Sequence, residues 1–185
     1  MIINTHNLKP IEGKYVNLRE VETSDAEFIL SLRCDEKKSR FLHKTEYNVD
    51  KQIAYINHYK TLADQWYFII ENKDHQAVGT IRIYDVEGSV FTGGSWLMKD
   101  GVSSGESIEG IILLKDFAFK TLGFEKEHFD VRKKNTKVLK FHNLCGATIV
   151  DENDLDYFLD LSKEVYLEKR NFFIKAFELE LTERK

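Results

Sequence analysis

Alternating apolar and polar positions predict a series of β-strands along the chain. The runs are rich in Val, Ile, Tyr and Phe, and Gly, Asn or Asp residues separate them, which is typical of strands joined by tight turns. Loop-like segments at Asn72–Gln76 and Glu87–Ser89 join three of them into a meander. The strands expected are Tyr15–Val21, Trp66–Glu71, Ala77–Val86, Val90–Met98, Glu127–Val131 and Leu155–Leu161.

Helical spacing of apolar residues predicts the other elements. The first helix would be capped by Thr23 or Ser24. The helix ending at Leu122 is apolar on most sides, apart from a polar stripe of Glu109, Asp116 and Lys120, so it should be covered on most sides. The expected helices are Asp25–Arg33, Asp50–Leu62, Ile108–Leu122 and Thr136–Leu144, followed by an amphipathic segment over Lys163–Phe177.

The order strand, helix, strand from Val90 to Val131 indicates a parallel crossover. The expected fold class is therefore α+β, a mixed α/β arrangement with a mostly antiparallel central sheet, one parallel pair and flanking helices. The loop Asp100–Ser107 would then lie at the carboxyl end of a strand and lead into a helix. Backbone N–H groups in that setting bind anions, although Ser103 and Glu106 also have the spacing of a plain capping box.

Composition and charge narrow the function classes. A chain of 185 residues with 42% hydrophobic content suits a single domain over residues 1–185. The net charge of −4, with both signs interspersed, gives no reason to expect nucleic acid or membrane as a partner, although a local patch stays open. No signal peptide or bilayer-spanning run is visible, so we expect a cytoplasmic protein. Cys34 and Cys145 match no metal or redox spacing, which predicts free thiols and no metal site.

Three further segments carry candidate chemistry. Gly93 and Gly94 inside a strand indicate a bulge or a close approach, or a simple kink. The aperiodic residues between Cys34 and Asn48 contain Arg40, Phe41, Leu42, His43 and Tyr47, which could line a pocket or form a plain surface loop. The amphipathic face of the last segment would complete the core or make a homodimer contact, and it comprises Val165, Tyr166, Lys169, Phe172, Phe173, Ala176 and Phe177.

Asn135 and His142 lie seven residues apart and so share one face of the helix over Thr136–Leu144. Asn135 could cap that helix and Gly146 could end it. A histidine on an apolar face is more often a core residue than a catalyst, so both interpretations stay open for His142.

The motifs GSWLM from Gly94, GESIEG from Gly105, FDV from Phe129 and NxxVLKFHxxCGA from Asn135 resemble the GNAT superfamily of acetyl-CoA-dependent N-acetyltransferases. The resemblance covers about Tyr15–Val150 and is most specific at the last motif. At the phosphate loop, the usual Arg/Gln-x-x-Gly-x-Gly/Ala falls on Val102–Ser107, so the leading basic or amide side chain is missing.

The resemblance implies a splayed parallel pair that holds acetyl-CoA as co-substrate. Pantetheine would contact Leu97, Met98 and Lys99, and Asn135 would contact the cofactor arm. His142 would replace the family's tyrosine as the acid that protonates the thiolate. The pyrophosphate would lie on the helix start at Ser103, Ser104, Gly105, Glu106 and Ser107.

The family's chemistry is direct attack of a neutral amine on a thioester. The base is not identified by sequence, and Glu71, Asp85 and Glu109 are candidates. The motifs look like enzymes that acetylate amino sugars carried on nucleotides, and rings at Trp66, Tyr84 and Trp96 could stack on a base or sugar. The alternatives are an enzyme acting on N-terminal peptides or polyamines, an acyl-CoA-binding module without turnover, and a phosphate- or nucleotide-binding protein unrelated to CoA.

Overall fold

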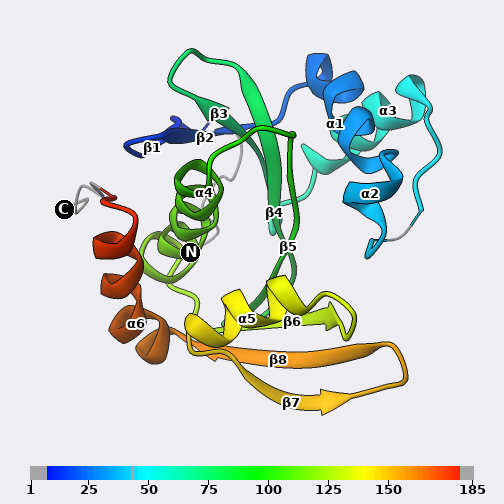
Figure 1. Cartoon of the computed structure of the whole chain (residues 1–185). Coiled ribbons are helices and arrows are strands. Elements are labelled where there is room, and N and C mark those ends of the chain that lie inside the picture. Colours follow the sequence, from blue (N-terminus) through cyan, green and yellow to red (C-terminus); the bar gives the residue numbers. More distant parts are fainter. Residues whose placement is uncertain (1–7, 43, 180–185) are drawn as a thin grey trace.

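The computed structural model describes residues 8–42 and 44–179, and its centre is an eight-stranded sheet (Figure 1). The strand order is β1-β2-β3-β4-β5-β6-β8-β7, and each neighbouring pair is antiparallel except β5 and β6. The expected mixed sheet with one parallel pair is therefore confirmed. The strands are β1 (Ile11–Glu12), β2 (Val16–Glu20), β3 (Trp66–Asn72), β4 (Ala77–Glu87), β5 (Val90–Met98), β6 (Lys126–Arg132), β7 (Thr148–Glu152) and β8 (Asp156–Ser162).

Helices cover both faces of the sheet. Strand β3 shows why, because Phe68 and Ile70 belong to the larger apolar cluster beneath α4, whereas Tyr67 and Ile69 pack in a smaller cluster with α1 and α3. Figure 1 shows α4 on one side of β4 and β5 and the three helices α1, α2 and α3 on the other. The helices are α1 (Ala26–Arg33), α2 (Glu36–Ser39), α3 (Val49–Tyr59), α4 (Ser104–Asp116), α5 (Thr136–Leu144) and α6 (Lys163–Ala176).

The central helix starts earlier than its apolar pattern predicted and has a different polar arrangement. Helix α4 begins at Ser104, so Ser104–Ser107 form its first turn, and a π-helical turn over Phe117–Thr121 continues it towards Gly123. The expected solvent-facing stripe is wrong in part. Glu109 is fully buried, and its carboxylate accepts the backbone N–H groups of Lys14, Tyr15 and Val16 at 2.6–2.8 Å. This carboxylate fixes the start of β2 against α4.

Other differences come from short or exposed elements. Strand β7 was not among the expected strands. All five residues of β7 are exposed, so no inward-facing apolar positions revealed it. Strand β1 and helix α2 are too short for periodicity to show. Before α1, the backbone N–H of Glu22 donates to Asp25 at 2.8 Å, so neither Thr23 nor Ser24 is the cap.

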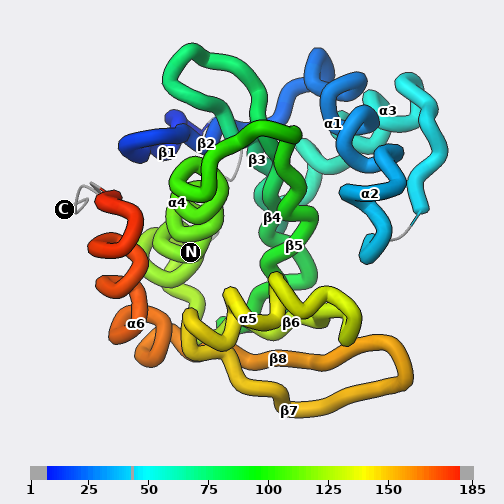
Figure 2. The backbone as a smooth tube through the Cα atoms, in the orientation of Figure 1, coloured from blue at the N-terminus to red at the C-terminus, as the bar shows by residue number. Residues whose placement is uncertain are grey.

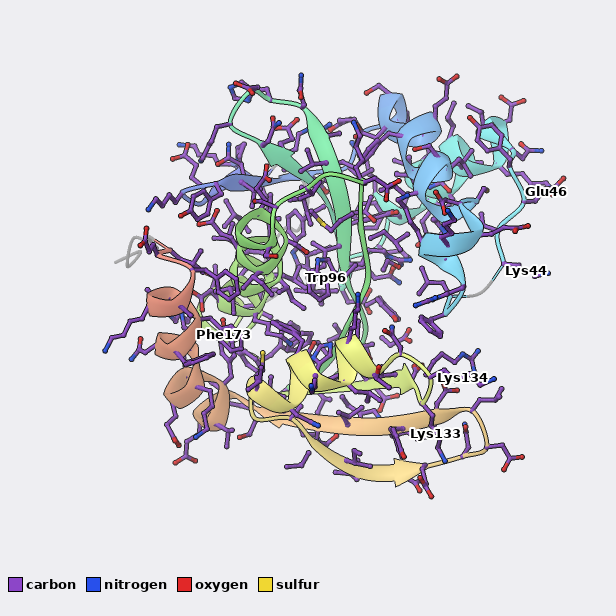
Figure 3. The ribbon with its side chains drawn as sticks, viewed as in Figure 1. Lys44, Glu46, Trp96, Lys133, Lys134 and Phe173 are labelled. Carbon is purple, nitrogen blue, oxygen red and sulfur yellow. The ribbon has the colours of Figure 1, made fainter. Side chains whose placement is uncertain are left out.

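The C-terminal helix α6 completes the core with a narrower face than expected. Tyr166 and Phe173 are buried in the main cluster, and Figure 3 shows Phe173 between α6 and the neighbouring helices. Lys169, Phe172 and Ala176 of the expected face are exposed, Phe172 to 57%, so they do not pack in the core of this chain, and the homodimer contact stays a prediction. No helix within residues 8–42 and 44–179 is long and apolar enough to cross a bilayer.

Candidate active site

Strands β5 and β6 pair only at their first residues and then separate. Their parallel register is limited to Val90 with Lys126 and Phe91 with Glu127. Where the backbones part, the Thr92 hydroxyl donates to the carbonyl of His128 at 2.8 Å. The two strands diverge from this point in the tube view (Figure 2). The predicted splayed parallel pair is therefore confirmed.

A bulge in β5 lies beside the point of separation. The register with β4 passes from Thr80 opposite Leu97 to Arg82 opposite Gly94, so β5 contains one extra residue there. Ser95 has φ 52°, and its carbonyl accepts the Thr80 hydroxyl at 2.9 Å. The bulge predicted from the glycine pair is thus confirmed.

The two glycines also permit close approaches. A Cβ on Gly93 would lie 2.4 Å from Glu127 Oε1, and a Cβ on Gly94 would lie 2.6 Å from the Tyr84 hydroxyl oxygen. Real Cβ atoms do not approach other atoms this closely, so any side chain here would displace Glu127 or Tyr84. The glycines therefore let polar side chains reach the splayed strands from both faces of the sheet.

A cavity of about 200 Å³ opens between the separated strands. Its walls come from both faces of the sheet, with Ile111 and Leu114 of α4 on one side and Phe41, Leu42 and Tyr84 on the other. Trp96 forms part of the wall, and Figure 3 shows it in the interior among α4, β5 and α5. Asn135 and His142 of α5 also line the cavity, so the structure brings these two predicted residues together.

The other predicted contacts lie further along β5 and at the start of α4. Leu97 is buried, Met98 packs against Gly79, and Lys99 is exposed. The backbone N–H of Lys99 donates to the carbonyl of Val78 at 2.8 Å. Because alternate residues of an antiparallel strand point to opposite neighbours, the backbone of Met98 points away from β4, towards the side that β6 has left.

The start of α4 carries the predicted capping box. The Glu106 backbone N–H donates to the Ser103 hydroxyl at 3.2 Å, and the Glu106 carboxylate accepts the Ser103 backbone N–H at 2.9 Å. The N–H groups of Ser104 and Gly105 have no acceptor within the helix, as in any first helical turn. A negative carboxylate therefore lies at the same helix end that would meet a pyrophosphate.

A buried ion pair lies beside the cavity, which its acidic member Glu127 lines. Lys115 of α4 is 0% exposed and Glu127 of β6 is 2% exposed, and the Lys115 ammonium donates to Glu127 Oε2. The ammonium also lies 5.6 Å from the ring centroid of Phe129. Sequence reasoning missed Glu127 as a cavity residue, yet it shares the inward parity of Phe129 and Val131 on β6. A charged residue at an inward-facing position of this strand was the sequence signal that could have identified Glu127 as a cavity residue.

His142 is a buried imidazole near the positive charge of Lys115. It is 6% exposed, its ring centroid lies 4.3 Å from that of Phe129, and no described residue accepts from or donates to its Nδ1. Burial, together with the positive charge of Lys115, lowers the pKa of His142 well below its usual 6.5. At neutral pH the ring is therefore neutral and has one N–H donor.

This lowered pKa predicts how the free energy of unfolding depends on pH. The unfolded chain binds a proton at this histidine below about pH 6.5, whereas the folded protein does so only at more acidic pH. Above pH 6.5 this histidine therefore does not lower the free energy of unfolding. Below pH 6.5 the free energy of unfolding falls by at most about 1.4 kcal/mol per pH unit. Urea titrations at pH 7, 6 and 5 should show this loss, and a His142→Gln variant should show less of it. Equal pH dependence in both proteins would contradict the assignment.

Asn135 occupies the N-cap position of α5 as predicted, but its side chain makes no capping hydrogen bond. Its amide thus stays available to the cavity. Gly146 has φ 94° and ends the helix as predicted. Cys34 and Cys145 are free thiols, and burial raises the pKa of Cys145 to about 12.

Two of the three candidate bases serve the fold. Glu71 pairs with Arg19 at 2.5 Å, and Glu109 holds the backbone of β2, whereas Asp85 is exposed. Trp66 is a core residue between Phe117 and Phe124, so it offers no free ring for stacking. Tyr84 and Trp96 do line the cavity, while His43 lies outside the described residues.

Comparisons with known proteins agree with this geometry. Residues 16–148 match the model of the Acetyltransferase (GNAT) domain. A solved structure described as apo FdhC, a nucleotide-linked sugar GNAT, matches with a TM-score of 0.82 and 32% identity, over 90% of this chain and 97% of that one. The search of curated proteins gives no match.

Two more distant structures show the fold alone. A GCN5-related N-acetyltransferase from Brucella melitensis has a TM-score of 0.77 at 14% identity, with 94% of this chain and 87% of that chain covered. A spermidine N-acetyltransferase SpeG chimera from Vibrio cholerae and hSSAT has a TM-score of 0.72 at 17% identity, with 83% and 99% covered. The domain match over most of the chain and the 32% identical structure together show that this chain belongs to the GNAT family and is an N-acetyltransferase.

Proposed function

We propose that this chain, as one domain, transfers the acetyl group of acetyl-CoA to the primary amine of an amino sugar carried on a nucleotide. The observation that carries the proposal is the cavity between β5 and β6, which both faces of the sheet line. A thioester could enter from the α4 side and an amine from the side of Tyr84. The 32% identity to a nucleotide-linked sugar GNAT supports this acceptor class over a polyamine, because the spermidine enzyme is only 17% identical.

The residues around the gap fit acetyl-CoA as co-substrate. The outward backbone of Met98 could pair with the pantetheine amides, flanked by Leu97 and Lys99. The free N–H groups of Ser104 and Gly105 could bind the pyrophosphate, at the helix end that Ser103, Glu106 and Ser107 complete. The uncapped amide of Asn135 and the unpartnered Nδ1 of His142 would then find partners along the cofactor arm.

The reaction is direct attack, in which the amine nitrogen bonds to the acetyl carbon and the carbon–sulfur bond breaks. A neutral His142 would stabilise the departing thiolate by donating its single N–H. Two carboxylates line the cavity, and Glu127 is already bonded to Lys115. Asp130 is exposed and also borders the surface hollow beside β4 and β6, so we assign to it the relay of the amine proton to solvent.

The Glu106 carboxylate should weaken binding of the pyrophosphate, because both are negative. Glu106→Gln keeps an acceptor for the Ser103 N–H and removes the charge, so the Kd for acetyl-CoA should fall about two- to five-fold, equivalent to 0.3–1 kcal/mol. Calorimetric titration measures this change, with Glu168→Gln on the exposed side of α6 as a charge-matched control. Weaker binding in Glu106→Gln alone would mean that the carboxylate helps to hold the ligand.

An acceptor panel tests the proposed function. Purified protein and acetyl-CoA are incubated separately with amino-sugar nucleotides, with polyamines and with N-terminal peptides, and acetylated products are identified by mass. We expect product from the amino-sugar nucleotides at a kcat/KM far above that of the others. Preferred acetylation of spermidine or a peptide would overturn the acceptor class, and binding of acetyl-CoA without any product would favour a non-catalytic module.

A further inference from the structure

A second cavity, of about 270 Å³, lies between α1, α3 and the adjoining face of the sheet. Its walls include Arg33 at the end of α1, Tyr55 of α3, Tyr67 of β3 and Arg82 of β4. Tyr67 belongs to the apolar cluster on the face of the sheet away from α4, so this cavity opens on the side opposite the proposed pyrophosphate site. Neither arginine takes part in the chemistry described above.

Arg82 is a cation that no carboxylate of the described residues pairs with. Its guanidinium carbon lies 5.0–5.4 Å from the ring centroids of Tyr55, Tyr67 and Tyr84. Within residues 8–42 and 44–179, its guanidinium donates only to the amide oxygen of Gln65, at 3.2 Å, and its buried Nε has no partner. Desolvating a charge without a counter-ion is unfavourable, so this arrangement favours an anionic ligand.

Arg33 adds a second unpaired charge to the same cavity. Its Nε donates to the hydroxyl of Thr45 at 3.0 Å, and no carboxylate of the described chain lies within salt-bridge distance. Lys51 also lines the cavity, but Glu46 already neutralises it at 2.6 Å. Arg19, Arg132 and Arg170 are paired with Asp25, Asp156 and Asp116, whereas the exposed Arg40 lies against the ring of Phe41. The cavity therefore carries a net excess of two guanidinium charges.

We propose that this cavity binds the diphosphate of a nucleoside diphosphate, with Arg33 and Arg82 as the phosphate ligands. Guanidinium groups suit phosphate because they donate parallel pairs of hydrogen bonds. Tyr55 is 36% exposed at the rim and supplies a ring for the base. This inference rests on the proposed function, and it names the part of the acceptor that the second cavity recognises.

The strand geometry connects the second cavity to the splayed strands. Arg82 and Tyr84 lie two residues apart on β4, so their side chains share a face at a spacing of roughly 7 Å. Arg82 is opposite Gly94 in the β4–β5 register, and Tyr84 lines the cavity at the splay. A diphosphate on Arg82 would thus place the attached sugar over Tyr84 and its amine towards Gly94. The same two charges would repel a cationic polyamine.

Calorimetric titration with thymidine diphosphate, uridine diphosphate and inorganic pyrophosphate tests the proposal without any turnover. We expect the wild-type protein to bind both nucleotides, and Arg82→Gln and Arg33→Gln each to bind them roughly 10- to 100-fold more weakly. Lys169→Gln removes one positive charge from α6, outside this cavity, so it should bind as the wild type does. Tyr55→Ala should weaken nucleotide binding more than pyrophosphate binding.

Titration with CoA distinguishes the second cavity from the pyrophosphate site at the start of α4, and it also verifies folding. Each arginine variant should bind CoA with the wild-type Kd. Unchanged nucleotide affinity in both arginine variants would overturn the proposal, as would an equal loss in Lys169→Gln or a matching loss of CoA affinity. Acetyl transfer to a nucleotide sugar with a KM unaffected by either arginine variant would refute this inference and leave the proposed function intact. Arginine-dependent nucleotide binding in a protein that acetylates none of the panel would support this inference and refute the proposed function.

Discussion

Lys115→Met should lower the free energy of unfolding by about 3–5 kcal/mol, because it leaves the Glu127 carboxylate buried without its partner. Lys115 is 0% exposed and Glu127 is 2% exposed, so water replaces little of the lost interaction with the ammonium. Urea denaturation followed by circular dichroism measures the change. A loss of this size is a large share of the total stability of an ordinary domain.

The double variant Lys115→Met with Glu127→Leu provides the matched control. Removing both charges of a buried pair is often neutral, so the double variant should recover most of the stability that the single variant loses. Changing the exposed Lys169, which pairs with Glu168 on α6, to Met should lower the free energy of unfolding by less than about 1 kcal/mol. The buried pair would be excluded as a strong structural element if Lys115→Met also cost less than about 1 kcal/mol.

His142→Ala should lower kcat about 100-fold and leave the KM for acetyl-CoA nearly unchanged. The physical reason is the loss of an N–H donor aimed at the sulfur, where negative charge develops only as the carbon–sulfur bond breaks. Removal of one such donor typically costs this much in kcat. Steady-state release of free thiol, with a saturating acceptor, gives both parameters.

His142→Gln tests whether the donor or the proton matters. Its amide N–H should restore part of the lost kcat, because a neutral donor is sufficient in this account. Since the pKa of His142 is lowered well below 6.5, the wild type and this variant should have parallel pH profiles above pH 6.5. A wild-type rate that alone declines through pH 7 would instead identify an imidazolium acid, and unchanged turnover in His142→Ala would remove His142 from the mechanism.

The sequence was sufficient for the sheet order around the site because each strand there has a buried face. A run of β-branched and aromatic residues located β3, alternation located β4, β5 and β6, and the glycine pair located the bulge. It was insufficient where burial gives no pattern. Strand β7 is exposed at every position, and Glu109 was interpreted as part of a polar stripe because spacing alone does not show which polar residues have buried partners.

Only part of the candidate site was accessible to sequence reasoning. Asn135 and His142 were predicted from one helix face and do line one cavity. Glu127 and Asp130 were missed because their positions depend on how β6 leaves β5, a long-range feature. Arg33 and Arg82 come from an α-helix and a strand that are far apart in sequence, so their shared cavity follows only from the packing of α1 on the sheet.

The central claim is that acetyl-CoA lies in the gap between β5 and β6 with its pyrophosphate on the start of α4. The most direct measurement is amide hydrogen exchange of the isotopically labelled protein, residue by residue by NMR, with and without acetyl-CoA. The account predicts that the amides of Met98, Ser104 and Gly105 become protected when the ligand binds. Binding with unchanged exchange at all three amides, or no binding of acetyl-CoA at all, would contradict it.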